Sequence, residues 1–338
     1  MTTHLPLLTT SAAKQYRACP RMYWLSSEQG YRSAFDDPNR AFGTLKHRGL
    51  EAWWTERMSR PTDPDAWLRV ALSEIARQSR DDFDHEKALA LMVGYHAMWA
   101  DEPMEVLAVE RQFQTDLRNP ATSGVSKTWG FGGKIDAIVR IDGEVWIVEH
   151  KTSSEDFSSG SDYRIRLQLD HQVSNYIAGA RSLGFDPKGC IYDVIGKPGQ
   201  KPLKATPEEA RKYTKPTKTE PSRLYAGQRL DDESPAEYGA RIAASILESP
   251  EKFFARWPVV RLADEEREAA FDLWQCGVQI RESRAANAWP RNPDACKRYG
   301  RSCDYLAACA GHASLEDPMR FRKAEKRNEE LEEGEKAA

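Results

Sequence analysis

Apolar residues recur at two different spacings along this chain, and the change of spacing marks a change of structure. Spacings of three and four positions predict amphipathic helices over residues 41–58, 65–78 and 85–99. Beyond residue 100 the apolar runs become short and rich in Val and Ile. Runs of this kind predict successive strands over residues 105–117, 129–141 and 144–152.

The two spacings alternate after the third predicted strand. A helix is predicted over residues 163–183, and a short buried strand over residues 190–195. Helical spacing returns over residues 236–247 and 264–288, and the charged residues 320–336 are predicted as a frayed helix. The order strand, strand, strand, helix, strand indicates an α/β fold.

The pattern divides the chain into five expected regions. These are a helical N-terminal region (1–100), a core (101–196), a basic insertion (197–235), a helical C-terminal region (236–315) and a charged tail (316–338). In the insertion, residues 197–218 contain six lysines and one arginine against two glutamates. This excess of cations is typical of a solvated loop, and it also fits an arm that contacts phosphates.

A two-residue turn aligns the second and third predicted strands. Asp142-Gly143 between two apolar runs is a strong signal for a β-hairpin. If Ile141 faces Glu144, the same register places Asp136 opposite Glu149. Directly opposed residues have Cβ atoms roughly 4.5–5.5 Å apart, and like charges there repel each other. A fold that keeps this pair therefore needs a cation between the two acids.

A lysine joins this pair of acids. Lys151 follows Glu149 by two positions, so the two-residue period of a strand sends both side chains to the same face. Two acids and a lysine thus converge at one end of the hairpin.

Composition limits the classes of protein that need to be considered. The 338 residues carry a formal net charge of −3, so nucleic-acid binding has to come from local patches. The chain has no long apolar run, and its first residues lack the pattern of a signal peptide. We therefore expect a soluble cytoplasmic protein with no membrane contact. In that compartment, six cysteines indicate thiols or metal ligands rather than disulfides.

The acids and the lysine carry a resemblance to a known family. Glu149-His150-Lys151 at the end of an apolar strand, with Asp136 on the partner strand, resembles the PD-(D/E)XK nuclease superfamily. Asp186-Pro187-Lys188 fits the same triplet, but it lies in a turn with no partner acid. The resemblance implies a restriction-endonuclease-like core, in which a mixed central sheet is flanked by helices.

Three further features resemble the RecB-like branch of that superfamily. Gly43-Thr44-Leu45-Lys46-His47 matches its Gly-x-x-x-His motif, which implies that His47 is a metal ligand. The segment from Gln172 to Tyr176 matches its Gln-x-x-x-Tyr motif, which implies a DNA-binding helix face. Glu110 falls where many members carry a catalytic acid on the first core strand.

The chemistry of phosphodiester hydrolysis suits these residue types. Mg²⁺ takes oxygen ligands, which Asp136, Glu149 and the backbone carbonyl of His150 can supply. The nitrogen of His47 makes Mn²⁺ an equally suitable ion. Lys151 is expected beside the attacking water and the scissile phosphate, where its charge stabilises the transition state.

The cysteines suggest a second metal centre. A subgroup of RecB-like nucleases holds a four-iron, four-sulfur (4Fe-4S) cluster with one cysteine before the core and three after it. The matching residues are Cys19, Cys296, Cys303 and Cys309. The spacing here is Cys-x6-Cys-x5-Cys, whereas the familiar spacing is Cys-x2-Cys-x5-Cys, so structural zinc and free thiols remain alternatives. Cys190 and Cys276 lie in apolar surroundings and are predicted as buried core residues.

The resemblance predicts a metal-dependent DNA nuclease, an exonuclease acting on DNA ends or single strands in recombination, repair or viral DNA processing. A helicase or a recombination protein is an expected partner. One alternative is a DNA-binding or recombination-partner subunit with the nuclease fold and little cleavage. Another is a metal-assisted hydrolase of a different phosphodiester.

Overall fold

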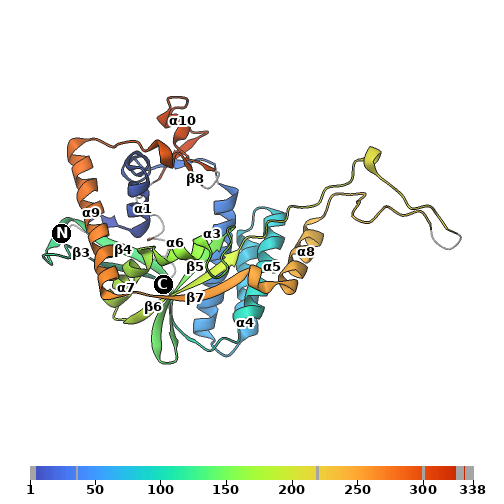
Figure 1. Ribbon diagram of the computed structural model, residues 1–338, viewed down its shortest axis with the longest axis horizontal. Coiled ribbons are helices and arrows are strands. Elements are labelled where there is room, and N and C mark those ends of the chain that lie inside the picture. Colours follow the sequence, from blue (N-terminus) through green and yellow to red (C-terminus); the bar gives the residue numbers. More distant parts are fainter. Residues whose placement is uncertain (1–4, 36, 218–220, 299–300, 325–330, 332–338) are drawn as a thin grey trace.

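A six-stranded mixed sheet forms the centre of the computed structural model, which describes residues 5–35, 37–217, 221–298, 301–324 and 331 (Figure 1). The strands lie in the order β1-β4-β5-β6-β7, and β3 pairs with the opposite edge of β4. Their bounds are β1 Leu7–Leu8, β3 Glu105–Arg118, β4 Val125–Ile141, β5 Glu144–Ser153, β6 Pro187–Gly196 and β7 Phe254–Val260. The predicted α/β class is confirmed.

Helices cover both faces of the sheet and bury a separate core on each. One face packs against α3 (Pro38–Ser59), α4 (Pro64–Gln78), α5 (Asp82–Trp99) and α8 (Pro235–Glu248). The other face packs against α1 (Thr10–Ala18), α6 (Asp162–Gln168), α7 (Gln172–Ser182) and α9 (Ala263–Ala286). Within the described residues, no helix is both long and apolar enough to cross a lipid bilayer.

The register of the hairpin is confirmed where β4 and β5 pair. Ile141 lies opposite Glu144, and the ladder runs in step to Ala137 opposite Val148. Asp142 and Gly143 have φ angles of 51° and 82°, as a two-residue turn of the primed type requires. The ladder ends one position before Asp136 and Glu149, so the two acids stand where the strands begin to separate.

One edge of β4 changes its partner close to Asp136. β1 runs parallel to β4 beside Gly130 and Phe131, whereas the pairing with β5 starts at Ala137. A Cβ atom on Gly132 would lie 2.8 Å from a methyl carbon of Leu7, so glycine permits this close approach. Within the described residues, no strand covers the edge between these two pairings. This interruption leaves room for polar side chains within the sheet.

The helix predicted over residues 163–183 is wrong as a single element. The chain forms α6 and α7 instead, with a break at residues 169–171. Asp170 causes the break, because its side chain accepts a hydrogen bond from the backbone nitrogen of Gln172 at 2.9 Å. Such local bonds compete with helical ones. Gln172 thereby becomes the first residue of a new helix.

A small lobe joins the two ends of the described chain. It consists of α2 (Pro20–Tyr23), a π-helical turn (Trp24–Glu28), β2 (Tyr31–Ser33), β8 (Lys297–Arg298), β9 (Arg301–Ser302), α10 (Leu306–Cys309) and β10 (Phe321–Lys323). Leu25, Tyr31, Tyr305 and Phe321 form its core. The helix predicted over residues 320–336 is wrong where it is described, because Phe321–Lys323 pairs with β2 as a strand. Most of that predicted helix lies outside the described residues.

Candidate active site

A cleft of about 530 Å³ lies between α3 and the strands β3, β4 and β5. Its lining contains four acids and two histidines together with three lysines. The acids are Glu51, Glu110, Asp136 and Glu149, the histidines are His47 and His150, and the lysines are Lys134, Lys151 and Lys197. The structure therefore brings the predicted catalytic residues together from four separate elements.

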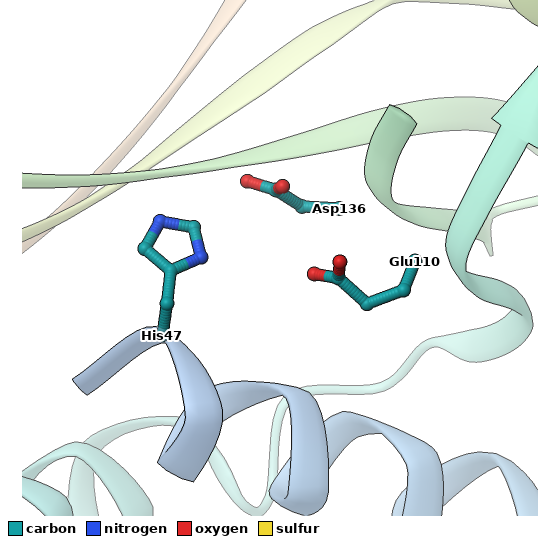
Figure 2. A group of neighbouring side chains, drawn as sticks. All are labelled: His47, Glu110 and Asp136. Carbon is teal, nitrogen blue, oxygen red and sulfur yellow. The ribbon is translucent and has the colours of Figure 1, made fainter. Parts of the chain in front are cut away.

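His47 reaches the acids from the helix opposite the sheet. Figure 2 shows its imidazole ring pointing from α3 toward the carboxylates of Glu110 and Asp136. One potential ligand atom from each of these three residues lies within 4.8 Å of the others. Burial, followed by the nearby charges of His150 and Lys46, lowers the pKa of His47 to about 3. The ring is therefore neutral at physiological pH, which is the form that binds a metal ion.

Glu110 enters the site through an unusual backbone conformation. Its φ angle is 49°, a left-handed value within the long strand β3, and such values are uncommon for residues other than glycine. Burial raises the pKa of Glu110, although an ion pair with Lys134 opposes that shift. The neighbouring pairs of the β3-β4 ladder place Glu110 across from Asp136. This position agrees with the acid expected on the first core strand.

Asp136 is the most crowded acid of the cleft. One of its oxygens accepts a hydrogen bond from the backbone nitrogen of His150 at 2.8 Å. Burial, then the negative charges of Glu149 and Glu110, raises the pKa of Asp136 well above its usual value. The site therefore concentrates negative charge that a divalent cation can neutralise.

Glu149 has one engaged oxygen and one unengaged oxygen. Its Oε1 accepts hydrogen bonds from Lys151 at 2.6 Å and from Gln172 at 2.7 Å. Its Oε2 is buried, and no described residue donates a hydrogen bond to it. A buried carboxylate oxygen without a partner carries a desolvation cost that a metal ion relieves. The donor set of carboxylates and a neutral imidazole fits Mg²⁺ or Mn²⁺.

Lys151 is held as a fixed positive charge. Burial lowers the pKa of its ammonium group, but the adjacent carboxylate of Glu149 outweighs that effect, and the pKa is raised overall. The Nζ atom also donates a hydrogen bond to Gln172 Oε1 at 3.0 Å. The predicted position of Lys151 on the same face as Glu149 is thus observed.

Gln172 lies directly beside Glu149 and Lys151, and Tyr176 lies beside Gln172. The Nε2 atom of Gln172 lies 3.0 Å from the hydroxyl oxygen of Tyr176, and its Oε1 accepts a bond from Lys14 at 3.2 Å. Burial, followed by the charge of Glu149, raises the pKa of Tyr176 well above its usual value. In this geometry the two residues fix the orientation of Glu149 and Lys151. Their contact with DNA stays a prediction.

His150 turns its side chain toward α3, where its ring centroid lies 6.1 Å from that of His47. Its Nδ1 lies 3.0 Å from the buried carboxylate of Asp193, which also accepts hydrogen bonds from Tyr95 at 2.5 Å and Arg256 at 3.0 Å. Burial alone would raise the pKa of Asp193, but the charge of Arg256 outweighs it and lowers that pKa. Metal binding by the carbonyl of His150 stays a prediction.

Sequence reasoning missed several polar residues around the cleft. Asp193 lies within the apolar run of β6, and an acid in a buried strand was the available signal. Lys46 is 4% exposed and donates to Thr152 Oγ1 at 3.1 Å, and burial lowers its pKa well below the usual value. The motif from Gly43 to His47 predicts a role for His47, but it gives no signal for Lys46.

The profile of the PD-(D/E)XK nuclease superfamily matches residues 7–310. The chain belongs to this superfamily. Every cleft residue described above falls within the matched segment, and the mixed sheet flanked by helices agrees with the assignment. Members of the PD-(D/E)XK nuclease superfamily are generally nucleases that hydrolyse phosphodiesters and use divalent metals.

Other comparisons with known proteins add little to this PD-(D/E)XK nuclease assignment. No curated protein matches the chain. Among solved structures, 10 chains match. One, described as "Crystal structure of SSO0001", is 12% identical, with 73% of this chain and 78% of that chain covered and a TM-score of 0.27. That similarity is too low to inform the site.

Four cysteines of this PD-(D/E)XK nuclease line a second cavity, of about 170 Å³, in the small lobe. They are Cys19, Cys296, Cys303 and Cys309, the four predicted as ligands of a cluster. The Sγ of Cys19 accepts a hydrogen bond from the backbone nitrogen of Asn292 at 3.4 Å. All six cysteines are free of disulfides, and Cys190 and Cys276 are buried in the main core as predicted.

Proposed function

We propose that this protein is a Mg²⁺- or Mn²⁺-dependent deoxyribonuclease, an exonuclease that acts on DNA ends or single strands. The observation that carries the proposal is the cleft itself. A neutral histidine, three acids, an unengaged buried carboxylate oxygen and a fixed lysine converge there. Recombination, repair and viral DNA processing are the settings in which such an enzyme would act, with a helicase or recombination protein as partner.

The residues that would hold the catalytic ion are His47, Glu110, Asp136 and Glu149. Bound there, a divalent ion polarises a phosphoryl oxygen and lowers the pKa of a water molecule. The carbonyl of His150 is a further proposed ligand. The chain supplies these donors from rigid strands and a long helix, so little reorganisation is needed on binding.

Lys151 would stabilise the charge that develops on the scissile phosphate. Its raised pKa keeps it protonated, so it acts as an electrostatic group rather than as a base. Gln172 accepts a hydrogen bond from Lys151 and donates one to Glu149, so it fixes the distance between the two charges. Gln172 and Tyr176 are proposed to contact DNA from the same helix.

We propose that the cysteine cavity holds a 4Fe-4S cluster, which would link the N-terminal and C-terminal parts of the chain. Four cysteines from the two ends of the chain line this one cavity, and four thiolates are what such a cluster requires. Structural zinc, which also takes four thiolates, is the alternative.

The test compares digestion of end-labelled linear DNA and circular DNA in Mg²⁺ or Mn²⁺. Lys151→Ala and Asp136→Ala are each expected to slow cleavage of linear DNA by about 10²–10³-fold or more, since each removes transition-state stabilisation. Lys188→Ala, which changes a half-exposed lysine near the hairpin turn, serves as the matched control. Equal rates in all four proteins would overturn the site assignment, and cleavage of circular DNA would overturn the exonuclease assignment.

The alternative function is a DNA-binding or recombination-partner subunit with little cleavage. The unengaged oxygen of Glu149 argues against it, because a binding module has no need for a buried acid without a partner. Tight DNA binding by wild type with no metal-dependent cleavage would favour this alternative. Competition between DNA and a small phosphodiester tests whether DNA is the preferred substrate.

A further inference from the structure

Residues 197–217 and 221–234, here called the arm, extend from the body of the protein beyond α5 and α8 (Figure 1). The outgoing and returning legs run antiparallel. Backbone bonds join Thr206 to Arg229 at 2.9 Å and Thr214 to Arg223 at 2.8 Å, and Tyr213 forms a bridge with Leu224. The arm has almost no buried apolar surface of its own, so an extended shape of this kind is stabilised mainly by its base and by a partner.

Charge is unevenly distributed along the arm. At its base, acids outnumber cations, and two of these acids form ion pairs: Asp232 pairs with Lys204 at 2.7 Å, and Glu233 pairs with Arg241 of α8 at 2.8 Å. The described outer part, residues 210–217 and 221–230, contains five lysines and arginines and no acid. Lys212 and Lys215 are exposed and take part in none of the ion pairs between described residues. The outer arm is therefore a strongly positive surface.

Two tyrosines stand among these cations. Tyr213 and Tyr225 are 51% and 49% exposed, which is high for residues with large apolar rings. The antiparallel pairing places Tyr225 and Lys212 on one face of the arm, and Tyr213 and Lys215 on the other. Each face thus combines an aromatic ring with a cation, the combination used to bind single-stranded nucleic acid.

The arm begins at the catalytic cleft. Lys197, its first residue, lines the cleft. The backbone nitrogen of Lys197 donates to the carbonyl of Ser153 at 2.7 Å, two residues beyond Lys151. A leg of about 20 residues can reach at most about 70 Å when fully extended. The arm therefore starts at the cleft and carries its positive outer part away from it.

We infer that the outer arm binds single-stranded DNA that extends beyond the cleft. Lys212 and Lys215 contact phosphates, and Tyr213 and Tyr225 stack on bases. This inference rests on the proposed DNA substrate and adds a second contact region to it. The arm would lengthen the footprint on DNA and hold the substrate during successive cleavage steps.

The experiment measures binding of fluorescent single strands of about 10 and about 40 nucleotides, lengths chosen to fall short of the arm and to span it. The full chain carrying Lys151→Ala is used, so that the DNA is not cut. Lys212→Ala with Lys215→Ala should weaken binding of the long strand about tenfold at low salt, and should reduce the salt slope by about 1.4. Tyr213→Ala with Tyr225→Ala should weaken it at least tenfold. Neither pair should alter binding of the short strand.

Lys127→Ala with Lys188→Ala removes two other surface lysines and is the matched control. If wild type cuts DNA and binds both lengths, but the arm variants bind the long strand as tightly as the control does, the inference about the arm is overturned and the proposed function stands. If neither length binds even without the arm substitutions, the proposed substrate itself fails. If the arm variants lose the same affinity for both strand lengths, the inference about the arm is also overturned, because such a loss would indicate a change in the cleft.

Discussion

The cleft and the cysteine cavity are built from distant parts of the chain in two different ways. The cleft residues stand on long regular elements, with His47 in a 22-residue helix and Asp136 in a 17-residue strand. The cysteines stand at the ends of very short elements, such as the four-residue helix that ends at Cys309. Hydrogen bonds and ion pairs hold the cleft side chains in place, whereas few bonds hold the sulfurs.

This difference indicates how each site depends on its bound group. Hydrogen bonds among the protein's own residues hold the cleft, so the metal ion proposed for it would serve chemistry rather than folding. The small lobe has only a four-residue core and short strands, so a cluster in the cavity would contribute to its folding. We therefore expect the removal of each group to have a different effect.

The largest expected effect is on the cysteine side of the comparison. Cys303→Ser should destabilise the protein by on the order of 5 kcal/mol, because loss of the cluster releases a closed loop that spans most of the chain. The midpoint of thermal unfolding should fall by about 10 °C or more. The anaerobically purified wild type should be brown, and the variant colourless. If Cys303→Ser unfolds at the same temperature as wild type and the control Ser302→Ala, the cavity holds no group that links the two ends of the chain.

The next effect tests whether Asp193, which pairs with His150 from the neighbouring strand β6, stabilises the side of the cleft that His150 forms. Asp193→Asn should cost about 3 kcal/mol, because it leaves the buried guanidinium of Arg256 with Glu102 as its one remaining carboxylate partner. The same change at Asp186, a 91% exposed acid that pairs with Arg181, should cost about 0–1 kcal/mol. Urea unfolding of both variants measures the difference. If both variants lose a similar amount of unfolding free energy, Asp193 does not support the cleft.

Metal binding should reveal that the cleft exists before the ion arrives. At 100 times its dissociation constant, Mn²⁺ should stabilise wild type by about 2.7 kcal/mol. Without metal, Asp136→Asn should be at least as stable as wild type, because the raised pKa of Asp136 shows that its charge is unfavourable in the folded state. With Mn²⁺ the order should reverse. Thermal unfolding with EDTA or Mn²⁺ tests this, and a destabilised metal-free variant would contradict a preformed, crowded site.

Mild acid should affect the two sites differently. The cysteine site should lose its cluster, whereas the fold around the cleft should change least. The folded pKa of Asp193 is lowered, so its stabilising effect is complete above its unfolded pKa of about 3.9, and is lost only as pH falls through the lower folded value. Thiolate ligands are protonated more readily, and burial raises the pKa of the free Cys303 thiol. From pH 7 to about 4, visible absorbance should disappear while near-ultraviolet circular dichroism from Trp53 and Trp54 persists. Simultaneous loss of both signals would mean that the sites are not independent.

Local sequence carried much of the information about the fold. The Asp142-Gly143 turn set the register that brings Asp136 and Glu149 together, since pairing in a hairpin follows from its turn. Strand and helix spacing located the main elements between residues 41 and 288. The break before Gln172 was not predicted, because a side-chain bond from Asp170 outweighed helical spacing.

The strand β7 shows a different limit. Phe254–Val260 contains a proline, which argues against a central strand, and its position at the edge of the sheet makes that proline tolerable. Edge position is a property of the assembled sheet. The same holds for β1, whose two residues pair with β4 only because a whole domain surrounds them.

By itself, the sequence determined the acids, the lysine and the histidine of the cleft, together with the spacing that places Lys151 beside Glu149. Only the tertiary structure decided that Glu110 turns toward His47, that Asp193 of β6 pairs with His150, and that the arm starts at the cleft. The physical reason is range. Turns and periodicity act over a few residues, whereas burial, pKa shifts and shared cavities depend on segments that meet only when the sheet is assembled.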